Sequence, residues 1–378
     1  MSKNIDFVNP INLKSSKKDV ISSLRDGGNI HGPGASYKKI INILNRKYNF
    51  NKILLTNSCT SALEISALAI NLKPNDEVIM PSYTFITTGS SFAKTNTKII
   101  YCDIEKDTLM PSFNQIKSKV TKKTKAIVIV HYQGFCVGYL KELKKYCKKK
   151  NIFLIEDAAQ SFGTKYKDKY LGSYGDLSCF SFHQTKNIHS GVGGCLVINN
   201  SKLYNKCLFA YDKGSDRILQ QKKIIKWYSW VSLGSSYLMS ELHASYLYPQ
   251  ILVYKKIIKK RKAIYNEYLK QLDFKNKSFY LVKNNTCDEF NHHGIAIVLK
   301  QKNYENYLRY LKKYNIQAFI GYIPLHKSKY GKRFLKSNSR LVVTDKIYNK
   351  IVRLPIHTNL SINDIQFISK KIKNYFNL

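Results

Sequence analysis

Short apolar runs recur along the first half of the chain, and each has the length of one buried strand. Between several of them, apolar residues recur every three or four positions, as in Leu140, Leu143 and Cys147, which is typical of a helix packed on one face. Strands that alternate with helices predict an α/β fold with a largely parallel sheet and a ligand crevice beyond the carboxyl ends of the strands. The runs are 53–55, 78–80, 99–101, 126–130, 152–155 and 195–198.

After about residue 200 the pattern becomes mostly helical, and a long helix is expected from Glu241 to Leu272. Beyond it, Gly294–Leu299 is expected to form a strand and Tyr304–Lys313 a helix. A chain of 378 residues is long enough for two domains. We therefore expect a large domain over residues 1–250 and a smaller C-terminal α/β domain over 251–378.

Composition narrows the class of protein. A hydrophobic content of 44% with 13% aromatic residues fits a folded globular protein. No apolar run approaches the roughly 18 residues of a membrane span, so we expect no membrane association. The eight cysteines include no C-x-x-C pair, which indicates reduced thiols in a cytoplasmic protein. His292 and His293 are adjacent rather than spaced as ligands, and we expect no metal site.

The formal net charge of +39 would ordinarily favour a nucleic-acid-binding protein. The excess is mainly lysine, however, and it is spread over the whole length of the chain. Lysines such as Lys144 and Lys145 fall on the polar side of an expected helix. We therefore expect no nucleic-acid partner, and we interpret the charge as a field that attracts an anionic substrate.

One lysine differs from the rest in its surroundings. Lys186 has no charged neighbour between Cys179 and Gly193, whereas other lysines come in runs. Ahead of it, Asp157 follows the apolar run 152–155. An acid at a strand end and an isolated lysine on a later turn are typical of a pyridoxal phosphate (PLP) site, where the lysine bonds to the cofactor and the acid pairs with the ring nitrogen. Taken singly, each has a simpler interpretation, as a solvated side chain and a helix N-cap.

A second feature is the turn Thr56–Ser61, which joins an expected strand to an expected helix. Its small hydroxyl residues leave backbone N–H groups and a helix dipole where a phosphate can bind, and Ser61 with Glu64 fits a capping box. Several polar segments follow strands in the same way and can converge on one crevice. They are Ser58–Thr60, Pro81–Phe85, His131, Asp157 and Lys186.

With these stretches in view, the chain resembles the DegT-type sugar aminotransferases, which are PLP enzymes. The stretch Gly234–Glu241 resembles a narrower group, the transaminases that act on TDP-4-keto-6-deoxy-D-glucose. The resemblance runs from about residue 27 to the C-terminus. The stretches that carry it are Asp76–Phe85 (DEVIMPSYTF), Glu156–Gln160 (EDAAQ), Cys179–Asn187 (CFSFHQTKN), Gly234–Glu241 (GSSYLMSE) and Tyr322–His326 (YIPLH).

The resemblance implies a type I aminotransferase fold, PLP as cofactor, and a homodimer with active sites shared between subunits. It implies that Lys186 bonds to the cofactor, that Asp157 pairs with the ring nitrogen, that Gln160 lies beside the ring hydroxyl and that Phe85 stacks on the ring. The positions that match the phosphate-binding residues are Cys59, Thr60 and Ser181. Many relatives have asparagine at position 236, where it reaches the partner's cofactor phosphate, and this chain has Ser236.

The substrate end is less defined. A nucleotide diphosphate needs cations, and the loop from Tyr211 to Arg217 offers Lys213 and Arg217, although a solvated loop is an open alternative. Tyr322 and His326 are also expected to contact the substrate.

The expected reaction is transfer of an amine from L-glutamate to TDP-4-keto-6-deoxy-D-glucose, giving TDP-4-amino-4,6-dideoxy-D-galactose. A different nucleotide keto sugar, or a nucleic-acid-binding protein on a degenerate scaffold, stays open. Some relatives are dehydratases with histidine in place of the lysine, and Lys186 argues against that activity.

Overall fold

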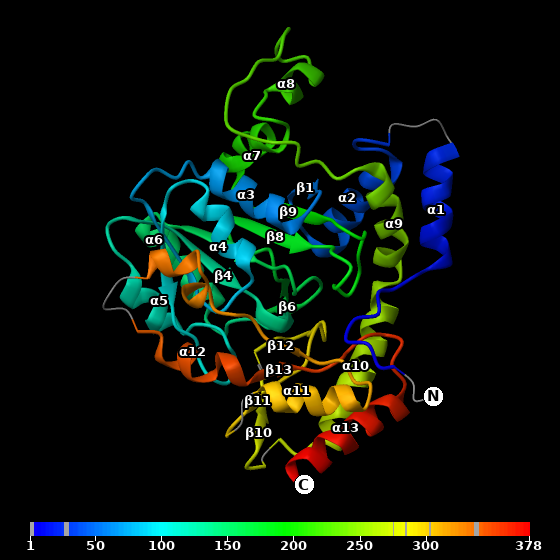
Figure 1. Cartoon of the computed structure of the whole chain (residues 1–378). Helices are drawn as coiled ribbons and strands as arrows, with labels where there is room; N and C mark the ends of the chain where they lie inside the picture. Colours follow the sequence, from blue (N-terminus) through cyan, green and yellow to red (C-terminus); the bar gives the residue numbers. More distant parts are fainter. Residues whose placement is uncertain (1–3, 26–29, 275, 284–285, 302–303, 336–339) are drawn as a thin grey trace.

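The computed structural model describes residues 4–25, 30–274, 276–283, 286–301, 304–335 and 340–378. Its centre is a seven-stranded sheet in the order β1-β9-β8-β5-β4-β2-β3 (Figure 1). Strand β9 runs antiparallel to both of its neighbours, and the other paired strands are parallel, so the α/β prediction is confirmed. The strands are β1 (Lys52–Thr56), β2 (Glu77–Pro81), β3 (Lys98–Cys102), β4 (Thr124–Val130), β5 (Phe153–Asp157), β8 (Leu177–Ser181) and β9 (Gly194–Ile198).

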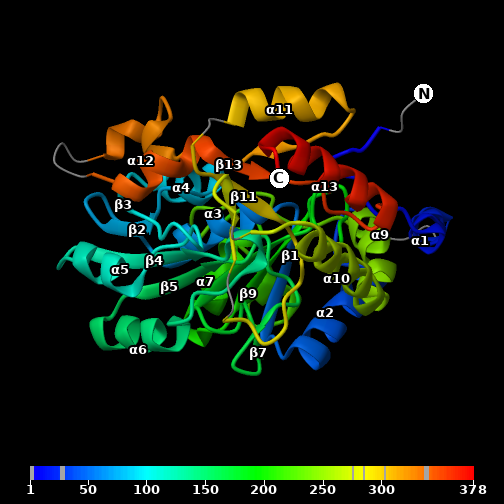
Figure 2. The ribbon, with the colours of Figure 1, turned by 90° about the horizontal axis from the view of Figure 1, so that it is seen from below.

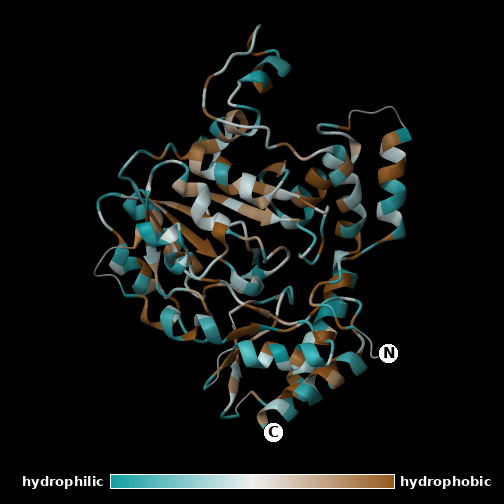
Figure 3. Ribbon diagram, viewed as in Figure 1, coloured by the Kyte–Doolittle hydropathy of each residue, from teal (hydrophilic) through white to brown (hydrophobic). Residues whose placement is uncertain are grey.

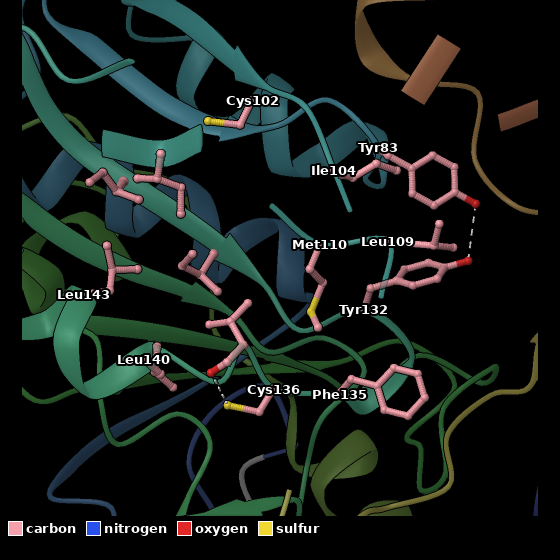
Figure 4. Close-up of a cluster of buried hydrophobic side chains, with 14 of the residues drawn as sticks. Tyr83, Cys102, Ile104, Leu109, Met110, Tyr132, Phe135, Cys136, Leu140 and Leu143 are labelled. Atoms are coloured by element: carbon pink, nitrogen blue, oxygen red, sulfur yellow. Dashed lines mark hydrogen bonds between the residues drawn. The ribbon is translucent and has the colours of Figure 1, made fainter. Parts of the chain in front are cut away.

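Helices cover both faces of this sheet, because alternate residues of its strands point to opposite sides. In β4, Ile127 and Ile129 pack with the buried face of α6, and Ala126 and Val128 pack with α3. Figure 4 shows part of the cluster on the α6 side. The flanking helices are α3 (Cys59–Ala69), α4 (Ile86–Ala93), α5 (Phe113–Lys119), α6 (Leu140–Lys150) and α7 (Tyr204–Tyr211).

A second, antiparallel sheet follows in the order β10-β11-β13-β12. Helices α10, α11 and α13 share a hydrophobic cluster with it and lie together in Figure 2. The expected strand near 294–299 and the expected helix Tyr304–Lys313 are both found. The elements are β10 (Phe279–Leu281), β11 (Ala296–Leu299), β12 (Phe319–Ile320), β13 (Ile351–Arg353), α10 (Tyr254–Gln271), α11 (Tyr304–Lys313) and α13 (Ile362–Phe376).

The helix expected from Glu241 to Leu272 is in fact two, α9 (Glu241–Leu252) and α10, which meet at Val253. Pro249 lies inside α9 and has no N–H to donate, which weakens the helix shortly before it ends. The domain boundary near residue 250 falls at this junction and stays a prediction. The remaining elements include α1 (Lys14–Arg25), α2 (Ala35–Tyr48), α8 (Arg217–Gln221), α12 (Val342–Ile347), β6 (Lys165–Tyr166) and β7 (Lys169–Tyr170).

Polar residues lie mainly on the surrounding helices, and Figure 3 shows the apolar strands between them. Helix α6 illustrates the reason: Leu140, Leu143 and Cys147 are buried, and Lys144 and Lys145 are exposed. Within the described ranges, no helix combines the length and the apolar character that a bilayer span requires.

Candidate active site

A cavity of about 620 Å³ lies beyond the carboxyl ends of β1, β4, β5 and β8, where it also meets β13 and the N-terminal segment 7–11. It brings together most of the residues singled out in the sequence, although they are up to 263 positions apart (Cys59 to Tyr322). Those on its wall are Cys59, Thr60, Phe85, His131, Asp157, Gln160, Ser181, Lys186 and Tyr322.

Lys186 is held at the tip of a hairpin-like hook that follows β8. The hook is closed by Phe182 N–H donating to Gly193 O (2.8 Å) and by Ser190 N–H donating to Phe182 O (2.9 Å). Burial in the cavity wall lowers the pKa of the Lys186 amine, although Cys59 and Asp157 act in the opposite direction. A lysine with a lowered pKa offers more of the neutral, nucleophilic amine.

Asp157 ends β5 and is 4% exposed. Its carboxylate accepts a hydrogen bond from Thr88 Oγ1 (2.6 Å) and one from the Ala159 N–H (3.2 Å). Burial raises the pKa of Asp157, and these two hydrogen bonds oppose the shift. The residues that follow form turns rather than a helix, so the N-cap interpretation has no helix to cap. A cationic ring nitrogen in the cavity would stabilise this carboxylate as an ion.

Glu156 is the neighbouring carboxylate and is fully buried on the other side of the strand. His131 Nε2 lies 2.9 Å from its Oε2. Burial alone would raise its pKa, but the hydrogen bonds, with that of His131 largest, hold the pKa of Glu156 below its ordinary value. Glu156 therefore holds neighbouring loops in place through hydrogen bonds, and Asp157 is the carboxylate of the pair that lines the cavity. Its other donors are the N–H groups of Gly172, Tyr174 and Gly175 and the Ser178 hydroxyl.

The amino end of α3 forms one end of the cavity. Its N-cap is Ser58, whose side chain accepts from the Ser61 N–H (3.0 Å), so the capping box expected at Ser61 and Glu64 is wrong. Glu64 instead accepts from the Tyr237 hydroxyl (2.9 Å). Early N–H groups of a helix have no partner within it, so Cys59 and Thr60 offer donors to a phosphate.

Gly194 allows β9 to approach this turn closely, because a Cβ atom at 194 would lie 2.5 Å from Cys59 N. Ser181, at the end of the adjacent strand β8, also lines the cavity.

Gln160 and two aromatic residues lie beside Asp157. Gln160 uses both ends of its amide: Nε2 donates to Tyr322 OH (2.7 Å), and Oε1 accepts from the Gln133 N–H (2.6 Å). Phe85 precedes α4, lines the cavity and is 53% exposed, so its ring is accessible to a flat ligand. Its ring centroid lies 5.9 Å from that of Tyr322.

His326 does not line the cavity, although it lies four residues after Tyr322. Its Nδ1 is 2.6 Å from Ser82 Oγ, and its Nε2 is 2.9 Å from Asp345 Oδ1. The imidazole therefore joins the end of β2 to α12, and both ring nitrogens are used for that purpose.

Three other expected residues lie on an arm, which we define as residues 212–236 and which projects from the body around α8 (Figure 1). Lys213 pairs with Asp212 (2.8 Å), Arg217 begins α8, and the Ser236 carbonyl accepts from Asn57 Nδ2 (3.0 Å). None of the three lines the cavity of this chain. The arm also exposes large apolar side chains, including Trp230, which is 80% exposed.

The sequence did not single out Arg353, which enters the cavity from β13. Its Nε donates to Ile320 O (3.0 Å), and its guanidinium lies 5.2 Å from the Phe7 ring centroid and 5.5 Å from that of Tyr322. Within the described part of the chain it has no acidic partner. The available signal was a charged residue directly after the apolar pair Ile351 and Val352.

These residues fit PLP. The cavity offers an amine of lowered pKa, a buried carboxylate, an aromatic face and a helix terminus with free N–H groups. Such a set can hold a flat, phosphorylated, nitrogen-containing ring and bond it covalently.

Comparison with known proteins agrees with this geometry. The chain is 26% identical to the GDP-perosamine synthase of Escherichia coli O157:H7 over 96% of each chain. It is 27% identical to the UDP-2-acetamido-2-deoxy-3-oxo-D-glucuronate aminotransferase of Pseudomonas aeruginosa, over 98% of this chain and all of that one. A Streptococcus pneumoniae sugar aminotransferase solved in its PLP form has the same fold, with a TM-score of 0.87, 23% identity and 98% of each chain covered.

Residues 13–373 match the DegT/DnrJ/EryC1/StrS aminotransferase family. The chain therefore belongs to this family and is a PLP-dependent aminotransferase.

Proposed function

We propose that the protein transfers the amine of L-glutamate to a nucleotide-linked 4-keto-6-deoxy sugar, with TDP-4-keto-6-deoxy-D-glucose as the preferred substrate and TDP-4-amino-4,6-dideoxy-D-galactose as the product. The observation that carries the proposal is the convergence of Lys186 and Asp157 on one cavity large enough for a sugar. The relatives named above act on GDP- and UDP-linked sugars, which supports a nucleotide sugar as the class of substrate.

The chemistry divides between the cofactor and the chain. Bound PLP supplies a ring that withdraws electrons from the carbon carrying the amine. Lys186 Nζ would anchor that ring and, once displaced by the amino donor, would take the proton from the donor carbon and return it to the cofactor carbon. The Asp157 carboxylate, held by Thr88 and Ala159, would keep a proton on the ring nitrogen. Phe85 and Gln160 would hold the ring in place, and Cys59, Thr60 and Ser181 would bind its phosphate.

Arg353 supports an amino acid as donor. Two guanidinium nitrogens are left after its bond to Ile320, and the guanidinium lies within 5.5 Å of the centroids of two aromatic rings on the cavity wall. Its charge contributes to lowering the pKa of Lys186, so the two groups are close enough to interact. A carboxylate one bond away from the reacting carbon would bind there in the bidentate geometry that arginine favours.

The arm supports a homodimer in which each subunit completes the other's site. Trp227 and Trp230 on the arm are exposed in this single chain. Large apolar side chains that are exposed together are typical of an interface with another protein. In such a dimer Ser236 would approach the partner's cofactor phosphate, and Lys213 and Arg217 would meet the substrate diphosphate. We place the reaction in the cytoplasm, where the free cysteines would stay reduced, and assign the product to cell-surface polysaccharide synthesis.

Purified protein incubated with PLP, glutamate and TDP-4-keto-6-deoxy-D-glucose tests the proposal, with product analysis by NMR. The expected product carries an axial 4-amine. An equatorial amine, or amination of a GDP- or UDP-linked keto sugar alone, would mean that the protein is a transaminase for a different nucleotide sugar. A protein that remains colourless with PLP and binds nucleic acid would contradict the proposal altogether.

A further inference from the structure

Two glutamines on the cavity wall are opposites in their hydrogen bonding. Gln160 has a partner at each end of its amide. Gln133 lines the same cavity and is 2% exposed, but neither Oε1 nor Nε2 of its side chain has a hydrogen-bond partner among the described residues. Buried amides are nearly always hydrogen-bonded, because an unpaired one loses its contacts with water and gains nothing.

The backbone of Gln133 is also unusual. Its φ of 59° lies in the left-handed region, which residues with a side chain seldom adopt. The conformation is fixed from outside, since the Gln133 N–H donates to Gln160 Oε1 (2.6 Å) and the Gly134 N–H donates to His131 O (3.1 Å). Two unfavourable features at one residue of a cavity wall indicate a functional constraint on its conformation.

A glycine elsewhere in the same chain leaves space for the side-chain amide of Gln133. A Cβ atom at position 294 would lie 2.6 Å from Gln133 Oε1 and 3.0 Å from its Cδ, so Gly294 allows the amide to occupy its place. The amide therefore packs directly against the backbone at Gly294, and none of the described residues around it supplies a hydrogen-bond partner.

We propose that the Gln133 amide hydrogen-bonds a hydroxyl of the sugar and helps to select the substrate, an inference that rests on the proposed function. A primary amide presents a donor and an acceptor side by side, and a hydroxyl both donates and accepts. Ionic groups have other partners in this cavity: Arg353 for a carboxylate, Asp157 for a ring nitrogen and the amino end of α3 for a phosphate. The partner left for the Gln133 amide is therefore a neutral polar group of the substrate.

The test replaces Gln133 with leucine, which has no hydrogen-bonding group, and separately with methionine, which has only a weakly accepting sulfur; both are of similar size to glutamine. The two half-reactions are followed by the absorbance of the bound cofactor, with glutamate and then with the keto sugar nucleotide. We expect kcat/KM for the sugar to fall about 10- to 100-fold and the glutamate half-reaction to change less than about twofold. We expect Tm to stay equal or rise, because an unpaired buried amide is removed.

Sugar analogues that each lack one hydroxyl give a second readout that packing alone would not produce. The wild type should discriminate against one of them about 10- to 100-fold, and the leucine variant should accept that analogue as well as the complete sugar. Unchanged discrimination in both variants, or equal damage to both half-reactions, would overturn the role of Gln133. A wild type that reacts with glutamate but with no keto sugar nucleotide would instead overturn the proposed function, and this inference with it.

Discussion

The two walls of the cavity are built in different ways. On the wall formed by the ends of β5 and β8, the groups come from short motifs, and protein partners already hold them in place, as Thr88 holds Asp157. The second wall combines Phe7 from the N-terminal segment with Tyr322 and Arg353 from the C-terminal part of the chain, and the Arg353 guanidinium has no acidic partner among the described residues. We infer that the first wall fixes the cofactor and that the second recognises what changes from one half-reaction to the next.

Lys186→Ala removes the central group of the first wall and should have the largest effect. Without the amine there is no covalent anchor and no proton carrier, so turnover should fall more than about 10⁴-fold. The visible absorption of the bound cofactor should also lose its response to glutamate. Lys202→Ala, an exposed lysine of the same charge, serves as the control. Transamination by the alanine variant at the wild-type rate would exclude Lys186 as the anchor.

Asp157→Asn keeps the shape of the same wall and removes its charge. The ring nitrogen would then lose its proton more readily, and turnover should fall roughly 10²- to 10⁴-fold. Both half-reactions should slow together, because both need the protonated ring. Circular dichroism and Tm check that the fold is kept. Near-normal turnover would mean that the carboxylate serves only the local hydrogen bonds to Thr88 and Ala159.

Arg353→Gln tests the second wall. Loss of a charged, bidentate contact should raise the concentration of glutamate needed for half-maximal reaction about 10- to 100-fold. The sugar half-reaction, started from the amine form of the cofactor, should change much less. Arg333→Gln is a matched control, because that guanidinium also stacks on a ring, at 3.8 Å from the Tyr330 centroid, but outside the cavity. If glutamate kinetics are unaffected, Arg353 does not bind the donor.

The contrast between the walls also explains what the sequence could reveal. Apolar runs predicted most strands of the central sheet, and the spacing from Asp157 to Lys186 located the first wall, because both residues follow strands that end at one edge. The exception is Leu177–Ser181, which is not among the predicted strands and forms β8 inside the sheet. The positions of the first wall depend on where strands end and turns begin, and these can be predicted from the local sequence.

Positions that depend on pairing between distant segments were harder to predict. The unpaired amide of Gln133 packs against Gly294, and the role of either residue can be recognised only once this contact is known. The two residues are 161 positions apart. The motif ending in His326 was expected to contact the substrate, but a 3₁₀ turn at Leu325–Lys327 directs the imidazole to Ser82 and Asp345 instead. Side-chain direction in a short turn cannot be obtained from periodicity, because the turn has no repeat.

The arm belongs to neither wall of its own subunit, and Arg217→Ala tests whether it belongs to the partner's cavity. Arg217 is on the projecting segment, where a diphosphate held across the interface would meet its guanidinium. A partly solvated contact of this kind contributes less than those inside the cavity, so the KM for the nucleotide sugar should rise only about tenfold, with the glutamate half-reaction intact. Arg46→Ala makes the same charge change at an exposed position of helix α2 and controls for the overall field. An unchanged KM for the sugar, or equal changes in the two variants, would assign Arg217 to the solvated surface of the arm.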